Sequence, residues 1–238
     1  MIPRAEAISP AVSGAEKEIA VLSLVGTSVC CVLTDMTIDE NGRTVLLLSR
    51  RKLQEQALSH LLETVREGDV LPGRITSMAP VGVFADIGCG VIALLPIRQI
   101  SVSRIGHPKE RFAERAPIFA AVQKIDRAQK RFCLSHRELL GTWRENAAAF
   151  HEGETVTGTV RGVKSYGIFI ELAPNLTGLA EPGEGYADGD RVSVLIKSIL
   201  PYRHKIKLHI VGKLPPRTHH ANLQYFIKEG NISDWSYL

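Results

Sequence analysis

The sequence is poor in cysteine, and its cysteines are not spaced for a metal site or a disulfide framework. It holds four cysteines in 238 residues, without a C-x-x-C pair or a Cys/His cluster of zinc-finger spacing. Cys30, Cys31 and Cys133 lie in apolar, β-rich runs, so we expect them to be buried, reduced thiols. No metal ion or other cofactor is expected.

Long hydrophobic stretches are also missing. No segment approaches the roughly 18 consecutive apolar residues that a membrane-spanning helix needs. Residues 1–6 do not have the charged-then-apolar layout of a signal peptide. We therefore expect a cytoplasmic protein without a membrane partner.

The chain also lacks the short motifs that mark common catalytic sites. It contains no phosphate-binding G-x-x-x-x-G-K-[ST] loop, no H-E-x-x-H and no G-x-S-x-G. Its acidic residues stand mostly in turns such as 67–69 and 188–190, where they favour turn formation. The adjacent pair His219 and His220 has no further ligand at a regular spacing, so a metal site there is not expected. These absences predict a protein that is not an enzyme and has no small-molecule substrate.

What the sequence does have is a globular composition with a mild positive charge. Hydrophobic residues make up 45% of it and charged residues 23%, and the formal net charge is +4. This charge is compatible with a polyanionic partner but does not require one.

Two segments of the chain are copies of each other. Residues 67–137 and 152–211 both open with an acidic-Gly-acidic turn and then place an x-Gly-x-Phe step, at 81–84 and 166–169, between alternating strands. Several short strands of period two within about 60–75 residues are typical of a five-stranded barrel of the OB type. The sequence therefore predicts a mainly β protein with tandem OB-type barrels.

A third copy, at the start of the chain, contains only the second half of the repeat. Residues 26–33 and 44–51 correspond to its last two strands, and Asn41-Gly42 predicts the tight turn between them. Half a barrel leaves an unpaired sheet edge, so we expect the natural chain to begin upstream of Met1. The expected organisation is a half-repeat at 1–51, a helical linker at 52–66, a barrel at 67–137, a linker at 138–151, a barrel with a shortened middle at 152–211 and a tail at 212–238, clipped onto a barrel by Tyr225, Phe226 and Trp235.

Strand alternation in the last repeat predicts which side chains face the solvent. Ile168, Ile170 and Leu172 form one face, which must be the core, and this leaves Phe169 and Glu171 outside, with Tyr166 nearby. On the closing strand Lys205 and Lys207 face outward in the same way, and Arg161 and Lys164 add positive charge. Exposed aromatic rings beside cations suit single-stranded nucleic acid, because bases stack on the rings while cations follow the phosphates. In the alternative, Phe169 covers a barrel end and the lysines are ordinary solvated residues.

The middle repeat is a weaker stacking platform. Phe84 and Asp86 face outward, but Val81 stands where the last repeat has Tyr166. Its loop at 101–114 is longer than the counterpart at 181–188, and loops at that rim often shape a ligand groove. The repeat compensates with positive charge, which favours salt-sensitive, sequence-tolerant contact with a phosphate backbone. These cations are Arg74, Arg98, Arg104, Lys124, Lys130 and Arg131.

The combined pattern resembles the S1 RNA-binding domain. The resemblance implies an OB-type barrel that binds single-stranded RNA; Asp126 and Arg131 match the acidic and basic positions near its last hairpin, and Lys205 is the counterpart of Arg131. The chain departs from the family pattern at Val81, which lacks a ring, and at Pro96 and Glu181, where many members carry a histidine. The candidate RNA-binding residues are Phe84, Arg74, Arg98, Asp126, Lys130, Arg131, Arg161, Lys164, Tyr166, Phe169, Lys205 and Lys207.

The resemblance also implies a setting. Ribosomal protein S1 and its shorter relatives bring messenger RNA to the small ribosomal subunit, so we expect single-stranded RNA as partner, messenger RNA in particular, and the small ribosomal subunit as a second partner. Two alternatives stay open: a protein-docking scaffold in which Phe84 or Phe169 engages a protein, and an RNA-gripping part of a larger RNA-processing protein.

Overall fold

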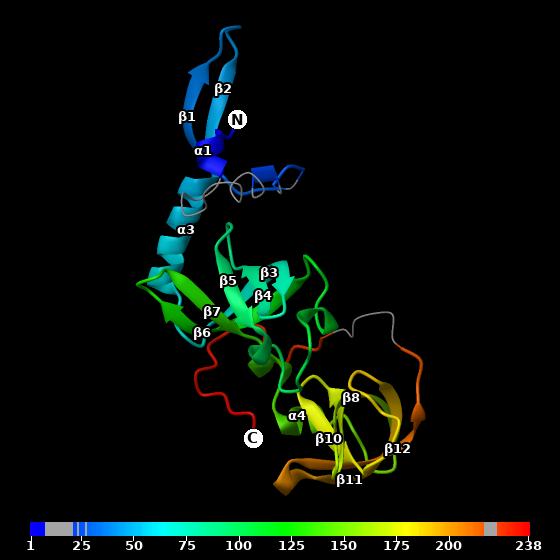
Figure 1. The fold of residues 1–238 in the computed structure, drawn as a ribbon. Coiled ribbons are helices and arrows are strands. Elements are labelled where there is room, and N and C mark those ends of the chain that lie inside the picture. Colours follow the sequence, from blue (N-terminus) through cyan, green and yellow to red (C-terminus); the bar gives the residue numbers. More distant parts are fainter. Residues whose placement is uncertain (8–20, 23, 27, 217–222) are drawn as a thin grey trace. The chain divides into compact units, whose positions relative to one another are not determined.

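The computed structural model describes residues 1–238 except 8–20, 23, 27 and 217–222 (Figure 1). It divides into two compact units. The first comprises Met1–Val65, Asp86–Ile92 and Asp126–Lys130. The second comprises Arg66–Ala85, Ala93–Ile125 and Arg131–Leu238.

The described residues are mainly β, as expected, with 42% strand and 18% helix. The N-terminal elements are α1 (Arg4–Ala7), β1 (Val32–Ile38), β2 (Thr44–Ser49) and α3 (Arg50–Thr64). A first group of strands follows: β3 (Val70–Ala79), β4 (Gly82–Asp86), β5 (Ile92–Pro96), β6 (Pro117–Asp126) and β7 (Arg131–Ser135). After α4 (Trp143–Ala147) comes a second group: β8 (Thr155–Lys164), β9 (Gly167–Ala173), β10 (Leu176–Ala180), β11 (Arg191–Leu200) and β12 (Lys205–Lys213). Short 3-10 helices are η1 (Ile97–Gln99), η2 (Pro108–Glu110), η3 (Arg137–Leu140) and η4 (Pro201–Arg203).

The N-terminal half-repeat is a two-stranded hairpin. β1 and β2 pair antiparallel, and the carboxylate of Asp39 closes the turn by accepting hydrogen bonds from the amides of Asn41 (2.9 Å) and Arg43 (2.8 Å). The first strand begins at Val32, later than the expected position 26. The second strand ends at Ser49, whose side chain accepts a hydrogen bond from the amide of Lys52 and so caps α3.

The expected burial of the cysteines is wrong for Cys30, which is exposed, and only partly right for Cys31 and Cys133, which are half-buried. Cys30 comes before the first strand begins, so no sheet face covers it. Cys133 points away from the core, because its neighbours Phe132 and Leu134 in β7 are the ones that point inward.

Two closed five-stranded barrels form the rest of the fold (Figure 1). Strands β3 to β7 make the middle barrel and strands β8 to β12 make the last barrel. In each, the strands follow the same order around the barrel: first, second, third, fifth, fourth. The third and fifth strands pair in parallel in both, as β5 with β7 and β10 with β12. This shared order confirms the tandem OB-type barrels expected from the repeats.

The second position of the x-Gly-x-Phe step must be glycine for the same reason in both barrels. A Cβ on Gly82 would lie 2.2 Å from the carbonyl oxygen of Leu95, and one on Gly167 would lie 2.6 Å from that of Ala180. In each barrel the second strand starts directly against the backbone of the third, and only glycine leaves room for this approach. The glycine therefore fixes where the following phenylalanine enters the strand.

The linker after the middle barrel is split into two short helices. Gly141, at a φ of 82°, ends η3, and Thr142 then caps α4 in a capping box with Glu145. Trp143 of α4 is buried and packs in the core of the last barrel together with Ile168 and other apolar residues.

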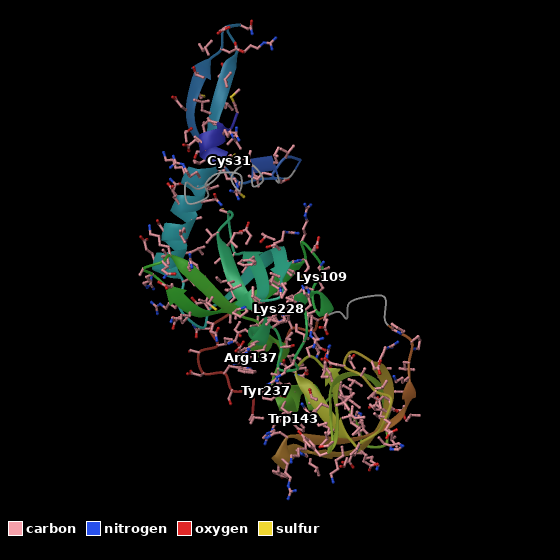
Figure 2. The ribbon with its side chains drawn as sticks, viewed as in Figure 1. Cys31, Lys109, Arg137, Trp143, Lys228 and Tyr237 are labelled. Atoms are coloured by element: carbon pink, nitrogen blue, oxygen red, sulfur yellow. The ribbon has the colours of Figure 1, made fainter. Side chains whose placement is uncertain are left out.

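The C-terminal tail packs on the barrels, as expected for Tyr225 and Phe226. The Phe226 amide donates to the carbonyl of Leu139 (2.9 Å). Further along, the Trp143 amide donates to the carbonyl of Tyr237 (3.1 Å), and these two residues lie close together in Figure 2. The pair His219 and His220 lies outside the described residues.

One end of the tail closes over a buried histidine. His136 is fully buried; its Nδ1 lies 2.7 Å from the carbonyl oxygen of Ile100 and its Nε2 lies 2.9 Å from the hydroxyl of Tyr225. Since a carbonyl can only accept, Nδ1 carries the proton and Nε2 accepts from Tyr225. This pairing requires the neutral imidazole, and burial lowers the pKa of His136 to about 4.

This histidine predicts a loss of stability in mild acid. The unfolded chain binds a proton at His136 below about pH 6.5, whereas the folded chain does so only below about pH 4. The contribution of neutral His136 to the free energy of unfolding is therefore fully present above pH 6.5. It falls by roughly 3 kcal/mol as the pH drops to 4. Urea denaturation across this range will measure it, and a His136→Gln variant will have a flatter pH profile. An identical slope in both proteins would contradict the assignment.

Candidate nucleic-acid interface

The outer face of the last barrel carries a row of residues that includes Phe169. The strand register pairs Phe169 of β9 with Gly162 of β8 and with Leu179 of β10, and Leu179 in turn pairs with Lys207 of β12. Directly paired residues on neighbouring strands point to the same face of a sheet, about 4.8 Å apart. We call these four residues the outer row. It places an aromatic ring, an aliphatic side chain and an ammonium group side by side.

Tyr166 extends the aromatic surface at one end of this row. Its side chain is 64% exposed, and its ring centroid lies 6.1 Å from that of Phe169 with the ring planes perpendicular. Phe169 is half-buried, whereas Ile168 and Ile170 on either side of it are fully buried in the core. The structure therefore brings the two predicted aromatic residues together on the outside of the barrel.

The predicted lysines of the last barrel are solvent-exposed. Lys205 and Lys207 alternate along β12 with Ile206 and Leu208, which are buried. Lys164 ends β8 beside the turn that holds Tyr166, and it is exposed as well. Their ammonium groups are thus accessible to a ligand on this face.

In the middle barrel the predicted site residues are more dispersed. Phe84 is half-buried between Val83 and Ala85, both fully buried, and Val81 is exposed where the last barrel has Tyr166. The remaining predicted residues of this barrel are placed as follows: Arg98 and Arg131 are exposed, and Arg74 is exposed and donates to the carbonyl of Arg115 (3.0 Å).

Asp126 and Lys130 lie at the turn between β6 and β7. The carboxylate of Asp126 accepts a hydrogen bond from the amide of Gln129 (2.8 Å), and Lys130 has a positive φ of 53°. Both residues shape this turn, and their role in binding stays a prediction.

Within the second compact unit, a buried charge cluster joins the 101–114 loop of the middle barrel to the last barrel. Glu171 of β9 accepts hydrogen bonds at Oε2 from Arg111 (2.6 Å) of the 101–114 loop and from Nε of Arg161 (2.6 Å) in β8. The side chains of all three are less than a tenth exposed. Glu171 does leave the barrel core, as alternation predicted, but the neighbouring barrel's loop covers it.

Arg161 therefore does not offer the free positive charge that we expected. Its Nη1 also donates to Glu110, so two carboxylates pair with it. Burial alone would lower the pKa of Arg161, but these carboxylates raise it above its usual value. Burial likewise opposes ionisation of Glu110, yet hydrogen bonds from Arg161 and from the amides of His107 and Gly106 hold its pKa below the usual range. The guanidinium serves the interface between the barrels.

Asn175 is a second interface residue, which strand alternation could not indicate. It is fully buried in the turn before β10; its Oδ1 accepts from the amide of Val102 (3.0 Å), and its Nδ2 donates to the carbonyls of Arg137 (2.6 Å) and Gly141 (2.8 Å). The hydroxyl of Tyr237, from the tail, donates to its backbone carbonyl (2.6 Å). One asparagine thus ties together the loop, the linker and the tail.

Metal-binding clusters and membrane-spanning helices are both absent from the described residues. Among the described residues, no group of three His, Cys, Asp or Glu side chains is placed to hold a metal ion. No helix in the described part of the chain has the length and apolar character needed to cross a membrane.

The two closed barrels are OB-type folds, and residues 64–137, the middle repeat, match the family model of the S1 RNA binding domain. This match identifies that segment as an S1 domain, supports RNA binding, and confirms the resemblance expected from the sequence.

Over most of its length the chain is similar to bacterial proteins named small ribosomal subunit protein bS1. The small ribosomal subunit protein bS1 of Staphylococcus aureus (strain COL) is 30% identical over 192 residues, covering 74% of this chain and 48% of the relative. The bS1 protein of Staphylococcus haemolyticus (strain JCSC1435) is 29% identical over 216 residues, covering 82% of this chain and 54% of the relative. The chain spans about half the length of these relatives.

The chain also has a weak similarity to proteins of known structure. A multidomain protein with nucleic acid binding domains from Streptococcus pneumoniae is 14% identical, with 74% of this chain and 59% of that chain covered and a TM-score of 0.31.

Because the charge cluster is buried, we expect one isosteric substitution in it to lower the free energy of unfolding strongly. Glu171→Gln removes the carboxylate that two buried guanidinium groups share, and leaving a buried charge without its partner costs about 3 kcal/mol. Urea denaturation of the variant will show this loss in the free energy of unfolding.

The matched control is Glu181→Gln, because Glu181 pairs with Lys197 in an exposed ion pair of the same barrel. Solvent screens that pair, so its loss will change stability little. Equal effects of the two substitutions would show that burial of the cluster does not matter.

Proposed function

We propose that this chain binds single-stranded RNA through the outer face of its last barrel. The observation that carries the proposal is the pair of Tyr166 and Phe169, 6.1 Å apart on that face, in line with Lys207 and beside Lys164. Unpaired bases stack on such rings with about 1–3 kcal/mol each, and the lysines attract the phosphates. Bases inside a duplex cannot reach the rings.

The proposal includes a weaker contribution from the middle barrel. This barrel offers one half-buried phenylalanine, Phe84, together with exposed arginines such as Arg98 and Arg131. Such a surface suits contact with the phosphate backbone more than base stacking. Two weak sites on one strand gain affinity, because binding at the first raises the effective concentration at the second.

We further propose that the RNA is messenger RNA and that the chain acts in translation at the small ribosomal subunit, in the cytoplasm, as a binding protein and not as an enzyme. The S1 domain at 64–137 supports RNA as the ligand. The similarity to proteins named for the small ribosomal subunit supports the setting, over the half of their length that this chain spans.

Fluorescence anisotropy with a labelled pyrimidine-rich RNA will test the stacking site. We expect the single strand to bind more tightly than a duplex and to weaken as salt rises. A Tyr166→Ala/Phe169→Ala variant will lose roughly 10- to 100-fold in affinity, since two stacking surfaces are removed.

The matched control is Tyr202→Ala, which removes another exposed ring from the last barrel, in η4 between β11 and β12; Tyr202 is neither in the outer row nor paired with Tyr166 or Phe169. We expect it to bind RNA like the unaltered chain. If the double variant binds as tightly as the unaltered chain, the aromatic pair is not an RNA site. If no nucleic acid binds even at low salt, the barrels are scaffolds for a protein partner.

A further inference from the structure

A groove runs along the contact between the two barrels, within the second compact unit. Its volume is about 520 Å³, within the range of about 300–1,000 Å³ that is usual for ligand sites. One wall belongs to the 101–114 loop of the middle barrel and the other to the last barrel. The lining residues are Val102, Ser103 and Arg104 on the first wall and Arg161, Gly162, Lys164, Tyr166, Phe169 and Thr177 on the second.

The loop wall is attached to the last barrel by direct hydrogen bonds. The hydroxyls of Ser103 and Thr177 lie 2.9 Å apart, and the Ser103 amide donates to the carbonyl of Pro174 (3.0 Å). The Val102 amide donates to Asn175 Oδ1 (3.0 Å), and the Arg111–Glu171 ion pair holds the far end of the loop. The groove therefore exists before any ligand binds, so binding does not carry the entropic cost of ordering this wall.

The two walls differ in chemistry in a way that fits one kind of ligand. The last barrel supplies the rings of Tyr166 and Phe169, and the loop supplies the partly exposed side chain of Val102. Within the part of the chain that the structure describes, Arg104 and Lys164 are exposed and make no salt bridge, whereas the charge of Arg161 is already paired. A slot that combines aromatic rings with two cations outside any salt bridge suits a flat base linked to phosphate.

We propose that this groove is a composite site in which an unpaired nucleotide of the RNA lies between the two barrels. Its base contacts Tyr166 and Phe169, and a neighbouring phosphate is bound by Arg104 from the middle barrel. This inference rests on the function proposed above and adds to it: the last barrel's binding face is completed by a residue of the preceding barrel. The strand therefore crosses from one barrel to the next without leaving the protein surface.

The experiment compares Arg104→Gln with Arg144→Gln in the full chain, by anisotropy with the same single-stranded RNA at several salt concentrations. Both changes remove one positive charge, but Arg144 is an exposed residue of α4 that does not line the groove. We expect Arg104→Gln to weaken binding about 5- to 10-fold and to reduce the slope of log affinity against log salt by about 0.7, the contribution of one phosphate contact to a single strand. We expect Arg144→Gln to change affinity by less than about 2-fold, because salt screens a charge that lies outside the groove.

A double-mutant cycle distinguishes a composite groove from two separate sites. Arg104→Gln is made in the Tyr166→Ala/Phe169→Ala background; in a shared site its effect there is much smaller than 5-fold, because the strand is no longer held beside Arg104. The inference is overturned if Arg104→Gln matches Arg144→Gln, or if its effect is the same in both backgrounds. If in addition Tyr166→Ala/Phe169→Ala has no effect, the proposed function itself fails. Circular dichroism will verify that each variant is folded.

Discussion

The arrangement of the proposed binding surface depends on one carboxylate. Glu171 stands between two guanidinium groups, Arg161 of its own barrel and Arg111 of the preceding barrel's loop, and nearly all of this cluster is buried. Buried charges are tolerated only when each is paired, so the cluster accepts few other relative placements of the loop and the barrel. Because the same loop carries Val102 and Arg104 into the groove, this ionic contact and the hydrogen bonds of Val102 and Ser103 together set the distance between the groove's two walls.

The two barrels share one scaffold and differ in what they place on it. Their strand orders are identical, and the glycine at the start of the second strand meets the same backbone carbonyl contact in both. On that scaffold the last barrel has Tyr166 and Phe169 together, whereas the middle barrel has Val81 and a half-buried Phe84. In the proposed function the two copies divide the work, with stacking concentrated in the last barrel and backbone contact in the middle one. The family model matches residues 64–137, the copy with the weaker aromatic surface.

Much of the fold could be predicted from the sequence because it is encoded locally. Period-two alternation placed Ile168 and Ile170 in the core and Phe169 outside, and the repeated Gly-x-Phe step located the second strands. What depends on contacts between distant segments could not be predicted. Arg161 reads as a solvated cation until the loop from the other barrel brings Glu110 beside it, and nothing near Asn175 or His136 in the sequence indicates their burial. Cys30 was misassigned because an apolar run predicts a strand but does not say where the strand begins.

In the proposed complex an RNA strand lies on the outer face of the last barrel, beside the loop that the charge cluster holds in place. Photo-cross-linking will locate the strand: single-stranded RNA carrying 5-iodouridine is irradiated with the full chain, and the cross-linked peptides are identified by mass spectrometry. We expect cross-links at Tyr166 or Phe169, which are the rings placed to stack on a uracil. Cross-links confined to the middle barrel or to the N-terminal unit would contradict this placement.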